Sequence, residues 1–91
     1  MISLSPRQQR LYDAIELSGL GVDAHISALY TAVWGAAPTG TPRSTQMSLG
    51  PVISHVNARL RRQSVMSGET AFLQIEPGDL KRTYRLVVVV E

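Results

Sequence analysis

Apolar side chains recur at helical spacing in three stretches of the chain. Residues that are three or four positions apart share one face of an α-helix, so each stretch predicts an amphipathic helix. The three apolar sets are Leu11, Ala14, Ile15 and Leu20; Ile26, Leu29, Tyr30 and Val33; and Leu49, Ile53, Val56 and Leu60.

Capping residues indicate where the first two helices begin and end. Ser5 and Gln8 have the spacing of a capping box, and Gly19 follows the first apolar set as a helix stop. Asp23 is the expected N-cap of the second helix, and Gly35 is its expected end.

The third helix begins either near Ser44 or only at Pro51, and it is expected to end near Arg62. Residues 35–45 before it are rich in Gly, Pro, Ser and Thr, which predicts a loop. At about 100° per residue, Ser54, Arg61 and Arg62 lie opposite the apolar stripe of this helix.

Beyond Arg62 the helical period ends. Residues 71–75 and 83–90 are rich in β-branched and aromatic side chains, and the turn residues 76–79 join them into a predicted hairpin. Residues 86–90 are apolar at every position, so we expect this strand to be covered, either by residues 2–4 or by a second subunit.

Three helices followed by a hairpin predict an α+β fold, with a single domain over residues 1–91. The outer face of the third helix is basic, and cations follow the hairpin turn. This order indicates a winged helix, with a recognition helix at about residues 44–62 in the major groove and a wing at residues 72–90 on the DNA backbone or in the minor groove.

The composition excludes several classes of protein. The 91 residues include no cysteine and two histidines, so neither a disulfide nor a metal site is expected. No Gly-x-Ser-x-Gly, phosphate-loop or paired-carboxylate pattern is present, so we expect no enzymatic activity and no cofactor. The longest apolar run, residues 86–90, is too short for a membrane span, and a cytoplasmic protein is expected.

Charge is distributed unevenly along the chain, although the net charge is only +2. Residues 24–68 contain four arginines and no acid, the three charged residues within 69–80 are all acidic, and cations return in residues 81–85. Eight of the nine cations are arginine, whose planar guanidinium suits phosphate and guanine better than the lysine ammonium does. An arginine-rich surface without a ligand is the alternative explanation.

The candidate DNA-binding residues combine both basic segments with polar side chains of the third helix. They are Arg43, Ser54, His55, Asn57, Arg59, Arg61, Arg62, Lys81 and Arg82. The cations are expected to hold phosphates, and the short polar side chains are expected to lie near base edges. Alternatively, Arg61 and Arg62 stabilise a helix C-terminus, and Lys81 and Arg82 only keep the hairpin in solution.

Three segments resemble, in order, winged-helix effector domains of the OmpR/PhoB type. Residues 32–35, Ala-Val-Trp-Gly, are similar to the Val-Trp-Gly that closes an early helix of that family. Residues 52–62 resemble its recognition helix, and residues 83–86, Thr-Tyr-Arg-Leu, resemble the Gly-Tyr-Arg-Leu at the end of its wing, with Thr83 in place of the glycine. The opening residues 4–9 are instead similar to the first helix of other bacterial winged helices, such as the N-terminal domain of LexA.

These features predict a stand-alone, sequence-specific regulator of transcription that binds double-stranded DNA, of bacterial or phage type. A homodimer is one expected form, and RNA polymerase or another regulator is a further expected partner. The alternative is a winged-helix protein-interaction module that binds host machinery without reading bases. Its protein-facing surface would be the acidic segment with Glu69, Glu76 and Asp79.

Overall fold

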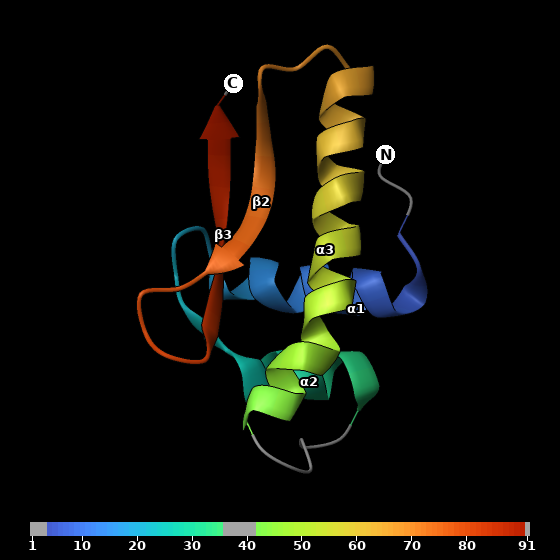
Figure 1. Ribbon diagram of the computed structural model, residues 1–91. Coiled ribbons are helices and arrows are strands. Elements are labelled where there is room, and N and C mark those ends of the chain that lie inside the picture. The colour runs from blue at the N-terminus through green and yellow to red at the C-terminus, as the bar shows by residue number, and fades with distance from the viewer. Residues whose placement is uncertain (1–3, 36–41, 91) are drawn as a thin grey trace.

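The computed structural model describes residues 4–35 and 42–90, except for the side chains of residues 42–47. These residues form three helices and one antiparallel sheet with the strand order β1-β3-β2 (Figure 1). The elements are α1 (Pro6–Ser18), β1 (Ala24–His25), α2 (Ile26–Trp34), α3 (Pro42–Met66), β2 (Ala71–Pro77) and β3 (Thr83–Val90). The α+β class predicted from the sequence is therefore confirmed.

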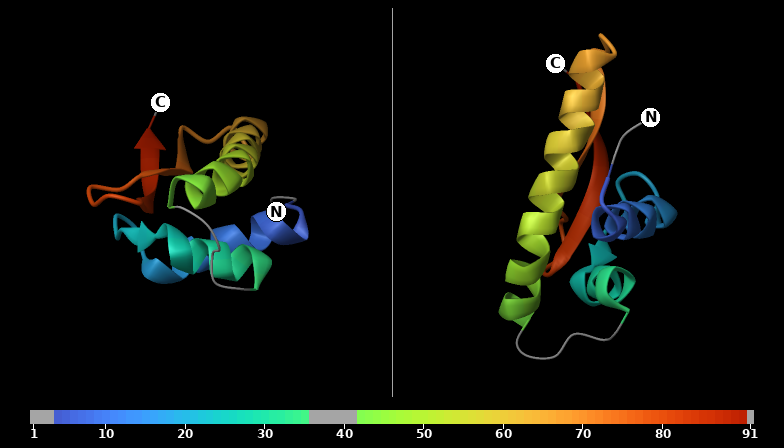
Figure 2. Two further views of the ribbon diagram at one scale, coloured as in Figure 1. Left: turned by 60° about the horizontal axis from the view of Figure 1, so that its bottom comes forward. Right: turned by 90° about the vertical axis from the view of Figure 1, so that its right-hand side faces the viewer.

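The elements form two layers, which Figure 2 shows from the side. Helices α1 and α2 lie together in one layer, and α3 lies with the β2–β3 hairpin in the other. Buried side chains from every helix and strand meet between the layers in one apolar cluster. Most of the predicted apolar sets belong to this cluster, but Leu20 lies beyond the end of α1 and is exposed.

The ends of α1 are those that the sequence predicts. The Ser5 main-chain N–H donates to Gln8 Oε1 at 3.1 Å, and the Gln8 N–H donates to Ser5 Oγ at 3.3 Å. This reciprocal capping box satisfies two donors that the first helical turn leaves without partners. Gly19 follows as the C-cap, and its N–H donates to Glu16 O at 3.0 Å.

The predicted N-cap of α2 is wrong. His25, not Asp23, caps this helix, because His25 Nδ1 accepts from the Ser27 N–H at 3.1 Å. The short strand β1 causes the shift: its pairing with β3 keeps the chain extended through His25. The predicted helix end is correct, since Gly35 adopts the left-handed conformation, φ 75°, at the C-cap.

Helix α3 is longer than the predicted range 44–62, and it begins before both predicted starts. It runs from Pro42 to Met66, with Pro51 in its interior. Proline removes one helical hydrogen bond and disfavours a helical residue before it, partly through the Cβ of that residue. Gly50 has no Cβ, and the buried Leu49 and Ile53 anchor the helix on both sides of Pro51, so the helix continues.

Two side chains of α3 close the outer edge of β2. Asn57 Nδ2 donates to Ile75 O at 2.9 Å, and the Ile75 N–H donates to Asn57 Oδ1 at 2.8 Å. Nearer the helix end, the buried Ser64 hydroxyl lies 3.2 Å from Ala71 O and 3.3 Å from Glu69 O. A strand edge shielded from water needs such partners, so these contacts fix the position of α3 against the sheet.

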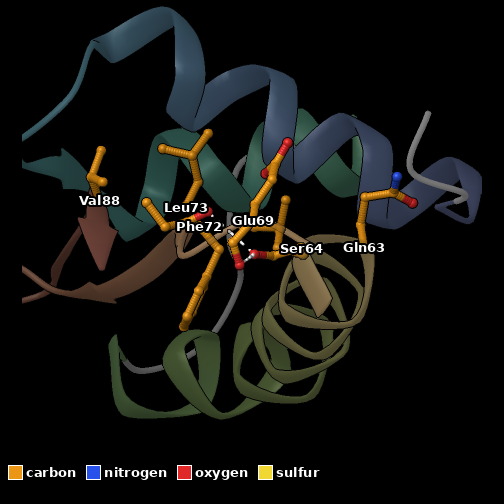
Figure 3. Close-up of a pocket in the computed structure, with 8 residues that line it drawn as sticks. Gln63, Ser64, Glu69, Phe72, Leu73 and Val88 are labelled. Atoms are coloured by element: carbon orange, nitrogen blue, oxygen red, sulfur yellow. Dashed lines mark hydrogen bonds between the residues drawn. The ribbon is translucent and has the colours of Figure 1, made fainter. Parts of the chain in front are cut away.

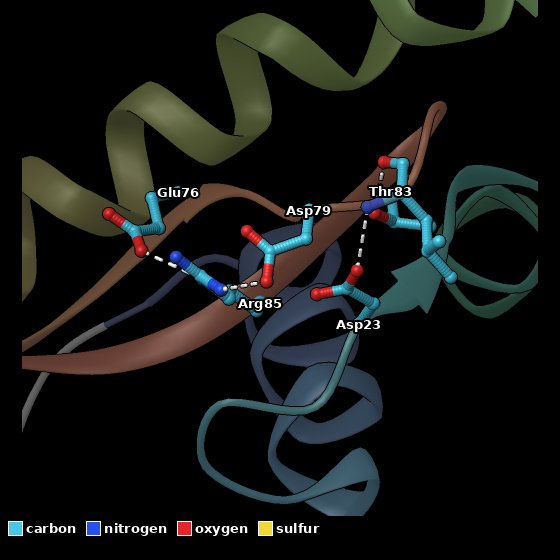
Figure 4. Close-up of polar contacts among 6 residues, drawn as sticks. Asp23, Glu76, Asp79, Thr83 and Arg85 are labelled. Carbon is cyan, nitrogen blue, oxygen red and sulfur yellow. Dashed lines mark hydrogen bonds and ion pairs between the residues drawn. The ribbon is translucent and has the colours of Figure 1, made fainter.

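The turn between β2 and β3 is attached to the body of the protein through Asp23 (Figure 4). Asp23 Oδ2 accepts from the Leu80 N–H at 2.9 Å, and the Thr83 hydroxyl donates to Leu80 O at 2.6 Å. Strand β2 continues through residues 76 and 77, which the sequence assigns to the turn, and the turn is formed by residues 78–82. A Cβ on Gly78 would overlap the Thr83 hydroxyl and the Asp23 carboxylate.

We expect Gly78→Ala to destabilise the fold by about 1–3 kcal/mol, the usual range for an added methyl group without space. The free energy of unfolding in urea measures this effect. Thr83→Ala removes one of the two colliding groups, so the double variant should lose less stability than the sum of the two single variants. Strictly additive losses would contradict the proposed collision.

We expect Asn57→Ala to lower the free energy of unfolding by about 1–3 kcal/mol, because it leaves the Ile75 N–H and C=O without their partners. His55→Ala, an exposed change two residues away on α3, is the control and should stay within about 0.5 kcal/mol of the unchanged protein. Thermal and urea unfolding of the three proteins would be compared. Equal stability of the two variants would contradict a structural role for Asn57.

Candidate nucleic-acid interface

The outer face of α3 points away from α1 and α2 and is uncovered by other described elements (Figure 2, right). Ser54, His55 and Arg62 are all exposed on it. At about 100° per residue, each lies within about 50° of the direction opposite the buried stripe. The structure therefore brings these three predicted site residues onto one surface.

Arg59 and Arg61 lie on opposite flanks of this surface. By the same helical geometry they are about 90° and 70° from the outward direction, on different sides of the helix. The Arg61 guanidinium lies 5.7 Å from the centre of the Phe72 ring, so this flank faces β2. Arg59 is exposed on the other flank. We call Ser54, His55, Arg59, Arg61 and Arg62 together the α3 surface.

Two other predicted residues of α3 do not join this surface. Asn57 is half-buried, and both ends of its amide bind the main chain of Ile75, so the structure gives it a positioning role toward β2. Polarity and position in the helix suggested a base contact, and nothing in the sequence shows which strand edge lies beside it. The side chain of Arg43 lies outside the described residues.

Lys81 and Arg82 are exposed in the turn between β2 and β3, as the sequence predicts. Arg82 has a positive φ of 59°, and its carbonyl accepts from the Ile26 N–H at 2.9 Å. The turn is thus attached at the start of α2. Because α3 and β2 run in opposite directions, the turn lies toward the N-terminal half of α3, away from Arg62 (Figure 1).

The acids near the turn are paired with one arginine (Figure 4). Arg85 Nε donates to Glu76 Oε1 at 2.8 Å, and its Nη1 donates to Asp79 Oδ2 at 3.0 Å. The hydrogen bond to Glu76, and then the charge of Asp79, raise the pKa of Arg85 above its ordinary value. Two of the three acids in the predicted acidic surface therefore share one positive charge, while Lys81 and Arg82 form no ion pair within the described residues.

A groove of about 320 Å³ lies between the C-terminal half of α3 and the hairpin (Figure 3). Leu60, Phe72, Leu73 and Val88 supply its apolar lining. The Ser64 hydroxyl on its wall is already bound to main-chain oxygens. Among the described residues, no group of three His, Asp or Glu side chains is placed to hold a metal ion. The groove thus has an apolar lining to which Gln63 and Glu69 add polar side chains.

The remaining observations concern the chain as a whole. No helix in the described ranges is both long and apolar enough to cross a membrane. The buried polar side-chain atoms of the described residues all have hydrogen-bond partners. Comparison of this chain with protein-family models, with curated proteins and with solved structures found no match.

Proposed function

We propose that this protein is a winged-helix regulator that binds double-stranded DNA, with α3 as the recognition helix and the turn after β2 as the tip of the wing. The α3 surface carries the proposal. This surface is exposed, α3 contains no acidic residue, and arginines lie on both flanks of the surface. A protein that grips an anionic duplex needs this combination of cations and absent acids.

The order of the elements supports the winged-helix assignment. The hairpin follows α3 and lies beside it, and the short β1 segment between α1 and α2 adds the third strand to the sheet. In helix-turn-helix proteins the later helix enters the major groove, and here that helix is the one with the uncovered face. An appended hairpin beside it can reach the DNA backbone.

The dimensions of α3 suit a major groove. A helix with its side chains is about 10–12 Å across, and the groove is about 12 Å wide. Arg59 and Arg61 on the two flanks would face the phosphates of the two strands. Ser54, His55 and Arg62 would face the base edges, where arginine pairs with guanine through two hydrogen bonds. Ser54 and Arg62 are eight positions apart, which is about 12 Å along the helix axis.

The turn supplies a second contact that does not depend on base sequence. Lys81 and Arg82 are exposed there, and the Arg82 carbonyl holds the turn against Ile26. Asp23 also binds the turn through the Leu80 N–H. These attachments limit the conformational freedom of the turn, so less ordering free energy is lost when the two cations bind phosphate.

We expect binding to duplex DNA to weaken steeply with salt. If about five phosphates are neutralised, the slope of log affinity against log salt concentration should be near −4 to −5. Fluorescence anisotropy on random duplexes, followed by selection of preferred sites, measures the slope and then the specificity.

An absence of DNA retention at low salt would contradict the proposal and favour the protein-interaction module. That alternative loses part of its support in the structure, because Arg85 binds both Glu76 and Asp79 and neutralises one of their two negative charges.

We expect changes in the helix and in the turn to affect DNA binding differently. Arg62→Ala should reduce affinity by about 1–3 kcal/mol and relax the preference at one base pair. Lys81→Gln combined with Arg82→Gln should weaken all duplexes about equally and make the salt slope shallower by roughly one unit per lost contact. Site selection and salt titration on each variant distinguish the two effects.

Arg7→Ala and Arg10→Ala provide charge-matched controls for these variants. Arg7 lies 6.0 Å from the Trp34 ring centre, and Arg10 Nη1 donates to Val33 O at 3.4 Å, so both cations face α2. Their removal should change DNA affinity less than removal of Arg62. Equal effects at all of these positions would indicate nonspecific charge attraction rather than a docked α3 surface.

A further inference from the structure

The outer side of β2 and the outer side of β3 have different hydrogen-bond partners. Asn57 and Ser64 of α3 bind the main chain along the β2 edge. At the β3 edge, β1 pairs with residues 83–84, and Leu86 O accepts from the Gly21 N–H at 2.8 Å. The pairing on this side therefore ends at Leu86, although β3 continues to Val90.

The main chain of Val88 and Val90 faces the same side as that of Leu86. Alternate residues of a strand direct their N–H and C=O groups to alternate sides. Ile75 is opposite Leu86 in the register, and its N–H and C=O point away from β3 to Asn57. The N–H and C=O of Leu86 therefore point away from β2, and those of Val88 and Val90 do the same. No described residue pairs with Val88 or Val90 on their outer side, so the last part of this edge is open among the described residues. Residues 2 and 3, part of the cover that the sequence suggests, lie outside the described residues.

The described side chains beside this open edge are apolar. Val88 is 53% exposed, Val90 is 73% exposed, and Leu20, which bridges to Leu86, is 60% exposed. Val88 also lines the apolar groove (Figure 3). Residues 86–90 contain no charge and no proline, the features that usually keep an edge strand from pairing.

We propose that the open end of β3 pairs with the same segment of a second copy of this chain. The two strands run antiparallel across a twofold axis at Val89, so that Val88 lies opposite the partner's Val90. This register gives two hydrogen-bonded pairs, each of which exchanges two main-chain bonds. The new pairing stops before Leu86, so the Gly21–Leu86 hydrogen bond is retained.

The absence of charge on residues 86–90 and the twofold symmetry of the pairing identify a second copy of the chain as the partner. The protein carries a net charge of +2, but the exposed cations of the described residues lie on α1, on α3 and in the turn, and none lies on residues 86–90, so two copies can approach at this uncharged segment. The pairing is isologous, and each chain has one open end of this kind in its described sheet because α3 closes the β2 edge. The product is a closed dimer with a continuous sheet, in place of an open fibre.

The dimer also leaves the proposed DNA surface accessible. In the sheet order β1-β3-β2, α3 lies beside β2 and the open edge belongs to β3, so the second copy would bind on the far side of the hairpin from α3. The inference rests on the strand edge and not on DNA binding. Its test is therefore made without DNA, and either proposal can fail while the other holds.

Sedimentation velocity of the full chain without DNA tests the dimer. Protein concentration is raised to about 1 mM, which populates a dimer with a micromolar dissociation constant. We expect the mass to rise toward twice 9.9 kDa. A monomer at every concentration would overturn the proposal, and so would growth into larger polymers.

Three variants locate the interface. Val90→Lys places a charge at the contact, and Val88→Pro removes an N–H from the open edge without removing a bond to β2. Both should weaken dimerisation at least tenfold. Val65→Lys is the matched control, because it makes the same change at a valine on α3 that is 65% exposed.

Circular dichroism and thermal melting establish that each variant is folded before its mass is measured. Val90→Lys keeps the test decisive if proline at position 88 disturbs the strand. A dimer that persists in folded Val90→Lys protein, or one that Val65→Lys disrupts equally, would overturn the assignment of the β3 edge.

Discussion

The pair of hydrogen bonds between the Asn57 amide and the main chain of Ile75 determines how α3 sits against the sheet. A main-chain N–H and C=O shielded from water need partners, and one side chain satisfies both. Together with Ser64 and the buried apolar stripe of the helix, this contact fixes the rotation of α3 about its axis. Asn57 faces β2, so Ser54, His55 and Arg62 face outward, and the chemistry of the exposed surface follows from one half-buried amide.

Electrostatic pairing within the fold determines which charges face a partner. Arg85 binds Glu76 and Asp79, so these three groups neutralise one another to within one charge at the surface of the hairpin. Asp23 accepts from the Leu80 main chain and holds the turn in place. Lys81 and Arg82 add two exposed positive charges to the turn and form no ion pair with the acids bound to Arg85.

Much of the fold could be predicted from the sequence because its signals are local. Helical spacing identified α1, α2 and the buried stripe of α3, and the capping box at Ser5 marks the start of α1. The bounds of α3 could not be predicted, because a proline such as Pro51 usually lies in the first turn of a helix. Gly50 before it and buried residues on both sides allow the helix to continue. The exposed cations could be predicted, whereas the role of Asn57 could not.

The sequence by itself determined the α+β class, the hairpin and the basic character of α3, since periodicity and turn chemistry act between neighbouring residues. Only the tertiary structure decided the partners of Asp23 and Asn57, the two-residue strand β1 and the open end of β3. Asp23 is 57 residues from Leu80, and Asn57 is 18 residues from Ile75. Such contacts depend on which distant segments the core brings together, and no local pattern of residue types encodes that proximity.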